Sequence, residues 1–204
     1  MGRTVDVTGD LTGDVVGTVA RLQVQRSRLK PGARGAKAYD PAPLLEVAEL
    51  EVGPRGAVGL VAGERVVDVH HADHPDSRWR GGNGLSLLPR AHAEALRQRY
   101  GDHLDGGRAG ESLLLDTAGP LREADLVGDL LLETVDGPPL RLSGAQAAPP
   151  CVEFSRWVLG REAGALDDEV LAALAALGCG ARGFYVDVHG TGRVRAGARL
   201  LRSA

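Results

Sequence analysis

The chain of 204 residues contains only two cysteines, Cys151 and Cys179. Two cysteines are too few for a disulfide framework, and their separation excludes the CxxC motif of a redox pair. Aromatic residues make up only 3% of the sequence, so valine, leucine and alanine must supply most of the core. Lysine is nearly absent while alanine, glycine and arginine are common, which we attribute to a GC-rich coding sequence rather than to function.

Charge and hydropathy argue against several other classes of protein. The net charge of −3 opposes nonspecific nucleic-acid binding, which depends on neutralising phosphates. No window reaches the roughly 20 apolar residues of a membrane-spanning helix, and no dense run of basic residues predicts a membrane-surface patch. Residues 1–10 also lack the apolar stretch of a signal peptide. We therefore expect a cytoplasmic protein with reduced thiols that binds neither nucleic acid nor membranes.

Short β-prone runs alternate with glycine- and proline-rich turns over most of the chain. The expected strands cover residues 15–24, 45–52, 57–61, 66–69, 85–88, 111–115, 125–132, 140–142, 183–188 and 193–201. Helical periodicity predicts helices over 91–100, 153–159 and 167–177, the first of which ends at Gly101. Many short strands with few helices predict an α+β fold, a mostly β barrel with short helices packed around it. We expect one domain over residues 1–204, with a core from about 15 to 201.

Cys151 follows two prolines at the predicted start of the 153–159 helix. Proline fixes φ near −65°, so the backbone before the thiol is held in place. A thiol that faced the amides of the first helical turn would gain thiolate character, with Arg156 favouring and Glu153 opposing the charge. The alternative is a buried, inert cysteine, which is the commoner fate of a lone cysteine and is favoured by the local sequence. We expect Cys179 to be structural.

Residues 68–76, Asp-Val-His-His-Ala-Asp-His-Pro-Asp, form the densest group of potential metal ligands. Imidazoles and carboxylates of this kind bind zinc and other divalent metals. His70 and His74 have helical i, i+4 spacing, but there is no HExxH motif and Pro75 opposes a continuing helix. A solvated polar loop is the favoured interpretation, and a metal hydrolase built on His70, His71 and His74 is the alternative.

The segment Gly106-Gly-Arg108-Ala-Gly110-Glu111-Ser112 is a glycine-rich entry into a predicted strand. It does not match the P-loop pattern GxxxxGK[ST]. Two interpretations stay open: backbone amides that cradle an anion with help from Arg108, or an ordinary turn. The absence of a GxSxG motif also argues against a serine hydrolase.

In their order along the chain, several short motifs resemble the MOSC domain, named for the C-terminal region of molybdenum cofactor sulfurases. Gly110-Glu111-Ser112-Leu113 is similar to the family's Gly-Glu-Asn-Leu, and Pro150-Cys151 to its Pro-Cys. The remaining matches are Gly17-Thr18-Val19, Gly59-Leu60, the Asp68 and His70 region, Tyr100-Gly101, Leu126-Val127-Gly128-Asp129, Arg182-Gly183-Phe184-Tyr185 and the closing 192–197. Together they cover residues 15 to 201.

This resemblance implies a mostly β barrel whose cysteine carries persulfide sulfur or ligates the molybdenum of a pterin cofactor. Some members reduce N-hydroxylated compounds, and pyridoxal phosphate binding is a further implied property. Carried over, the catalytic or molybdenum-binding role falls on Cys151, and cofactor binding on Arg108, Gly110, Glu111, Ser112 and Arg182. His70 is a further candidate metal ligand. The implied partners are a small-molecule substrate and a cysteine desulfurase-like sulfur donor.

Three positions depart from the family pattern. Ser112 replaces an asparagine, Ala148 stands where the family often has arginine, and Ala198 replaces an aspartate. Losing a guanidinium and an amide weakens the case for a tightly held anionic cofactor. Two hypotheses follow: a cysteine-dependent MOSC protein for sulfur carriage or molybdenum–pterin binding, or a noncatalytic small-ligand binding module on the same barrel with Cys151 buried.

Overall fold

The computed structural model describes residues 13–33, 36–79, 81, 84–162 and 164–203. Residues 1–10, where we expect no signal peptide, lie outside this part of the chain. The α-helices are α1 (Arg90–Tyr100), α2 (Val152–Val158) and α3 (Asp168–Ala176), with short 3₁₀ turns η1 (Asp102–Leu104) and η2 (Glu123–Leu126). The strands are β1 (Val15–Gln25), β2 (Leu44–Val47), β3 (Glu49–Gly53), β4 (Gly56–Val61), β5 (Glu64–Val67), β6 (Leu85–Pro89), β7 (Leu113–Asp116), β8 (Leu130–Leu132), β9 (Leu140–Ala147), β10 (Phe184–His189), β11 (Gly192–Arg195) and β12 (Arg199–Arg202).

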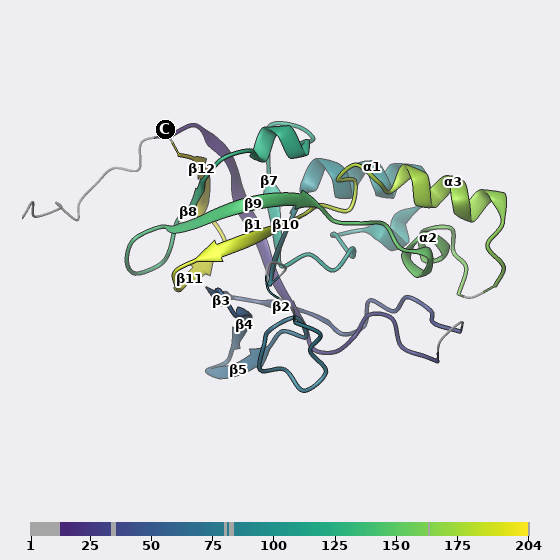
Figure 1. The fold of residues 1–204 in the computed structure, drawn as a ribbon, viewed down its shortest axis with the longest axis horizontal. Helices are drawn as coiled ribbons and strands as arrows, with labels where there is room; N and C mark the ends of the chain where they lie inside the picture. The colour runs from purple at the N-terminus through teal and green to yellow at the C-terminus, as the bar shows by residue number, and fades with distance from the viewer. Residues whose placement is uncertain (1–12, 34–35, 80, 82–83, 163, 204) are drawn as a thin grey trace, which may run out of the picture.

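Seven strands close into a barrel in the order β12, β8, β9, β10, β6, β7 and β1, and the pairing of β1 with β12 completes the ring. All neighbours are antiparallel except β6 and β7, which are parallel. The long strand β1 pairs in turn with β12, β7 and, at its far end, β2. A second antiparallel sheet, in the order β11, β3, β4 and β5, lies beside the barrel (Figure 1).

Leucine and valine side chains, among them Leu22, Leu85, Leu113 and Leu130, fill the barrel together with Phe184. The alternating burial along β10 shows why, since every second residue of a strand points to the same face. A second apolar cluster forms where the helices gather at one end of the barrel (Figure 1). Within the described residues no helix is long and apolar enough to cross a membrane.

The predicted mostly β barrel with short helices is confirmed. Each predicted helix is present within a residue or two of its expected bounds, and Gly101 ends α1 with φ of 117°. Asp167 caps α3, because its Oδ1 accepts a hydrogen bond from the backbone amide of Val170 at 3.0 Å.

Two expected strands are each divided in two, because the chain passes from one sheet to the other. The 45–52 run breaks at Ala48, since β2 pairs with β1 whereas β3 pairs with β4 and β11. The 193–201 run breaks at a turn in which Gly197 has φ of 89°, a region that favours glycine. Its first half, β11, joins the small sheet, and its second half, β12, joins the barrel. The β-prone composition of these two runs predicted extended structure but not the sheet that each half would join.

Other strand limits also differ from the predicted ones. The first part of the expected 125–132 strand is the 3₁₀ turn η2, where the Asp125 carboxylate accepts a hydrogen bond from the Arg122 amide at 2.7 Å. The strand expected at 140–142 extends to Ala147, the one expected at 111–115 begins only at Leu113, and β5 ends before Asp68. Local side chain to backbone bonds of the kind that Asp125 makes compete with strand pairing.

Candidate functional site

A cavity of about 1030 Å³ lies at the C-terminal end of β1, where Gln25 lines it. Its walls come from segments far apart in the sequence: the β1–β2 connection, residues 69–78 after β5, the 109–112 segment before β7, the Pro149–Glu153 segment, and Arg182 with Tyr185. Of the predicted site residues, the cavity brings together Cys151, Gly110, Ser112, Arg182 and His70.

Cys151 is partly buried and is the N-cap residue of α2, with extended backbone angles. Its side chain makes no hydrogen bond to the first helical turn, so the expectation that those amides face the thiol is wrong. Arg156 does not flank the thiol either, since its Nη2 bonds to the Gly164 carbonyl, whereas Glu153 does line the cavity. The cation next to the sulfur is Arg182, whose Nη1 lies 3.7 Å from Sγ.

Arg182 is held in place by carbonyl groups from two other segments. Its Nη1 donates to the Pro149 carbonyl at 2.9 Å, and its Nη2 donates to the Ala109 carbonyl at 3.1 Å. The guanidinium also lies over the ring of Phe154, 4.5 Å from its centroid. These contacts fix a positive charge beside the thiol.

An aromatic group supports this wall of the cavity from behind. Tyr39 contacts Phe154 edge to face at a centroid distance of 4.8 Å and Trp157 at 5.1 Å. The Tyr39 hydroxyl donates to the Arg108 carbonyl at 2.5 Å. Burial raises the pKa of Tyr39, so its hydroxyl stays protonated and acts as a donor.

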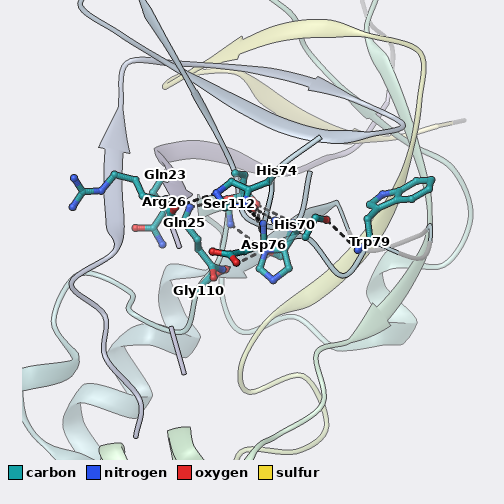
Figure 2. Close-up of polar contacts among 12 residues, drawn as sticks. Gln23, Gln25, Arg26, His70, His74, Asp76, Trp79, Gly110 and Ser112 are labelled. Atoms are coloured by element: carbon teal, nitrogen blue, oxygen red, sulfur yellow. Dashed lines mark hydrogen bonds and ion pairs between the residues drawn. The ribbon is translucent and has the colours of Figure 1, made fainter. Parts of the chain in front are cut away.

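The Gly110-Glu111-Ser112 segment is anchored to β1 and β6 (Figure 2). Two glutamine side chains of β1 donate to it at 2.7 Å: Gln25 to the Gly110 carbonyl and Gln23 to the Glu111 carbonyl. The Ser112 amide bonds to the hydroxyl of Ser86 at 3.0 Å. Gly110 and Ser112 line the cavity, whereas Glu111 and Arg108 do not, and the Arg108 side chain bonds to the Asp105 carbonyl. Cofactor binding by these residues stays a prediction.

Glu111 points away from the cavity into the protein, where its side chain is almost fully buried. Its Oε1 lies 3.0 Å from Nη2 of Arg21, which also donates to the Gly107 carbonyl at 2.9 Å. Burial raises the pKa of Glu111 to about 7, although Arg21 and the amides of Glu111 and Ala109 pull it down. The carboxyl therefore supports the turn from inside the protein.

Asp68 and His70 form a carboxylate–imidazole pair at the end of β5. Asp68 is only 3% exposed, and its Oδ2 accepts a hydrogen bond from the backbone amide of Gln25 at 2.7 Å. Its Oδ1 accepts from the His70 amide at 2.8 Å and lies 3.0 Å from the ring nitrogen Nδ1 of His70. The imidazole is held by a buried carboxyl group while His70 lines the cavity.

The other two histidines of this segment have local structural roles. Nδ1 of His71 accepts a hydrogen bond from the Asp73 amide, and Nδ1 of His74 accepts one from the Asp76 amide. His74 also contacts the Arg26 carbonyl through Nε2 at 3.2 Å, so it connects this loop to the β1–β2 connection (Figure 2). Among the described residues no group of three or more His, Cys, Asp or Glu side chains could hold a metal ion. The histidine-based metal hydrolase therefore lacks a ligand set there.

The cavity is rich in positive charge although the whole chain carries a net charge of −3. Among the residues that the structure describes, five cationic side chains line it, against two carboxylates, Asp76 and Glu153; the cations are Arg28, Lys30, Lys37, Arg78 and Arg182. Lys30 and Lys37 are the two lysines of the entire sequence. Sequence reasoning missed four of these cations. We attributed the scarcity of lysine to the coding sequence. The signal that we overlooked is that both lysines of the chain lie within eight residues of each other, in the β1–β2 connection.

Solved structures with a similar fold include the YUAD protein from Bacillus subtilis, at a TM-score of 0.54 and 11% identity over 90% of this chain and 93% of that chain. YiiM from Geobacillus stearothermophilus gives a TM-score of 0.50 and 17% identity over 95% of this chain and 76% of that chain. These identities establish similarity of fold alone. No curated protein gives a significant match. The family model of the MOSC domain matches residues 69–200, more than half of the sequence, and so this chain belongs to the MOSC domain family.

Proposed function

We propose that this protein binds a molybdenum–pterin cofactor in the cavity, with Cys151 as the protein ligand of the metal. The observation that carries the proposal is the presence of a partly exposed thiol and five cationic side chains in one cavity of about 1030 Å³. Pockets of roughly 300–1,000 Å³ hold drug-sized ligands, so this volume suits a cofactor together with a small substrate.

The side chains fit the chemistry of such a group. A thiolate is a soft ligand suited to a transition metal, and Arg182 offsets its charge from 3.7 Å. Guanidinium and ammonium groups bind phosphate through charge-assisted hydrogen bonds. Because Ala148 removes the arginine often found in the family, Lys30, Lys37 and Arg28 of the β1–β2 connection are the groups that we assign to the phosphate.

When bound, the molybdenum centre supplies two-electron chemistry of the kind used to reduce N-hydroxylated compounds. The protein's own part is to hold and orient. Cys151 presents its sulfur from a backbone fixed by Pro149 and Pro150, and Arg182 keeps the sulfur and the Pro149 carbonyl in one arrangement. The apolar ring of Phe154 beneath Arg182 limits hydration of that face of the guanidinium.

The cofactor content of purified protein tests the proposal. The wild type, produced in a host that makes the cofactor, should carry close to one equivalent each of molybdenum and phosphorus by elemental analysis. Cys151→Ser should lose molybdenum, and the double variant Lys30→Gln/Lys37→Gln should lose both elements. Cys179→Ser is the matched cysteine control and should retain both. Wild-type protein without molybdenum would contradict the proposal.

Sulfur carriage is the second candidate, and it is favoured by the partial exposure of a thiol beside a cation. In this function Cys151 thiolate attacks the outer sulfur of a persulfide on a cysteine desulfurase-like donor. The sulfane sulfur passes to Cys151, and the donor leaves as its thiolate. Mass spectrometry should then find a persulfide on Cys151 and none on Cys179. A protein with neither metal nor persulfide, whose Cys151 ignores iodoacetamide, would instead be a noncatalytic binding module.

A further inference from the structure

Residues 107–112 carry part of the cavity wall, and each of their six carbonyl groups accepts a hydrogen bond of 2.5–3.1 Å. In chain order from 107 to 111, the donors are the side chains of Arg21, Tyr39, Arg182, Gln25 and Gln23, and the Gln23 amide bonds to the carbonyl of residue 112. Arg182 is one of these donors. The place of the cation beside Cys151 therefore depends on how this segment is held.

The Arg182 guanidinium has few contacts that fix it. Its Nε is buried and has no hydrogen-bond partner among the described residues, so its two Nη groups supply all of its hydrogen bonds there. The Ala109 carbonyl, at 3.1 Å, is the one acceptor that the described chain gives to Nη2. A displacement of Ala109 thus frees one arm of a guanidinium whose other arm lies 3.7 Å from the Cys151 sulfur.

Behind this wall lies a buried ion pair, neither member of which lines the cavity. The side chain of Glu111 is 1% exposed, and its Oε1 lies 3.0 Å from Nη2 of Arg21, which also donates to the Gly107 carbonyl. Gly107 has φ of 69°, and a Cβ at this position would collide with Oε1 of Glu111. Only glycine therefore leaves room for the carboxyl beneath the segment.

Ala109 connects this ion pair to Arg182. Burial raises the pKa of Glu111 to about 7, and the amides of Glu111 and Ala109 join Arg21 in lowering it. The carboxylate and the Ala109 amide thus attract each other, while the carbonyl of the same residue accepts a hydrogen bond from Arg182. A continuous series of contacts leads from the buried pair to the thiol.

We propose that the buried Arg21–Glu111 pair positions the groups around Cys151. The pair holds the Ala109 carbonyl in the place where that carbonyl orients the Arg182 guanidinium beside the thiol. Because neither side chain lines the cavity, the pair acts on the thiol through Arg182 and not on a ligand. The inference deepens the proposed function, and its bearing on metal binding rests on that function.

Iodoacetamide alkylation tests the inference in full-length protein from a host that does not make the cofactor. At about pH 8, where the buried carboxyl is ionised, Arg21→Gln should slow Cys151 about two- to fivefold, as expected for modest coupling within one network. Exposed Cys179 is the internal standard. The matched control is Arg65→Gln, which breaks an exposed pair with Glu51 outside the cavity and should leave the rate unchanged.

A double-mutant cycle separates positioning from a general structural defect. In the Arg182→Gln background, Arg21→Gln should slow Cys151 no further, because the cation that the pair positions is absent. A general defect would act in both backgrounds. Arginine side-chain NMR adds a spectroscopic signature: the Nε–H signal of Arg182 should shift in Arg21→Gln and stay in place in Arg65→Gln.

A second variant removes both charges together. Arg21→Gln leaves a buried carboxylate without its cation, whereas Arg21→Met/Glu111→Leu leaves no unpaired charge, and apolar replacement of a buried ion pair is commonly tolerated. This double variant should unfold in urea close to the wild type. It should nevertheless show slow alkylation of Cys151 and a shifted Arg182 signal, and it carries the test if Arg21→Gln fails to fold.

Three results would overturn the inference: a wild-type Cys151 rate in Arg21→Met/Glu111→Leu, an Arg21→Gln effect that persists without Arg182, or an Arg182 signal that does not shift. Failure of the proposed function is a separate result, because these measurements use cofactor-free protein. Wild type that never binds molybdenum would remove the cofactor and leave the positioning in place. Molybdenum-binding wild type with no effect of the variants would do the opposite.

Discussion

The guanidinium of Arg182 lies 3.7 Å from the sulfur of Cys151, although 31 residues separate them in the chain. The same side chain bonds to the carbonyls of Pro149 and Ala109, so a single residue connects three segments of the cavity wall. The predicted flanking charge, Arg156, is turned toward Gly164. The environment of the thiol therefore depends on packing between segments rather than on neighbours in sequence.

Replacing Arg182 should slow alkylation of Cys151. Removing the positive charge in Arg182→Gln should lower the rate with iodoacetamide roughly tenfold, the factor that about 1.4 kcal/mol of charge interaction represents. Arg182→Lys keeps a charge and should fall between the two. Peptide mass spectrometry measures both cysteines in one sample, and exposed Cys179 is the internal control. Equal Cys151 rates in wild type and Arg182→Gln would contradict this prediction.

Glu111 should make the protein less stable as pH rises from about 4.5 to about 7. Its folded-state pKa is raised to about 7 by burial, so the unfolded chain releases this proton at lower pH than the folded protein does. Folding then becomes less favourable over that interval, by about 3–4 kcal/mol if the full shift applies, and this contribution is constant at higher pH. Urea unfolding across this pH range measures the free energy of unfolding.

Glu111→Gln removes the titrating group and should abolish this part of the pH dependence. The difference between wild type and Glu111→Gln isolates Glu111 from all other titrating groups. Asp102→Asn, at an exposed aspartate in η1, serves as a carboxylate control. A difference that stays constant from pH 4.5 to pH 7 would show that the folded-state pKa of Glu111 is not raised.

A methyl group at Gly183 should destabilise the fold more than the same change at Gly63. Both glycines have positive φ, 89° and 87°, so alanine is strained at either. A Cβ at Gly183 would lie 2.2 Å from the Leu87 carbonyl oxygen, whereas one at Gly63 meets nothing within 4 Å. We expect about 1–2 kcal/mol for Gly63→Ala and clearly more for Gly183→Ala by urea unfolding. Equal losses would indicate that β6 shifts to accommodate the methyl group.

The two lysines should account for much of the affinity of the cavity for anions. Lys30→Gln/Lys37→Gln should bind inorganic pyrophosphate roughly tenfold more weakly by calorimetry, about 1.4 kcal/mol. Arg65→Gln/Arg90→Gln changes the net charge equally at exposed sites outside the cavity and should bind almost as the wild type does. Added salt should narrow the difference, since it screens exposed charges. Equal binding by both double variants would assign the effect to net charge alone.

Much of the fold was predictable from local pattern. Short β-prone runs bounded by glycine and proline located strands such as β4 and β6, and helical periodicity with Gly101 located α1. The ordered motifs pointed to the MOSC domain, which the family model confirms. The failures at Ala48 and Gly197 share one cause, because hydrophobic alternation shows that a strand has a buried face but not which sheet it joins.

Some features of the candidate site could likewise be predicted from the sequence, and others could not. The sequence by itself determined that the fold is a mostly β barrel and that two prolines fix the backbone before Cys151. It also identified Arg182 and His70 as candidate site residues. Only the tertiary structure decided that Arg108 and Glu111 face away from the cavity, that Asp68 fixes the His70 ring, and that Lys30 and Lys37 line the same space as the thiol. Patterns along a chain report local periodicity and turn chemistry. A cavity is formed by distant segments packed against one another, so its charge depends on long-range contacts.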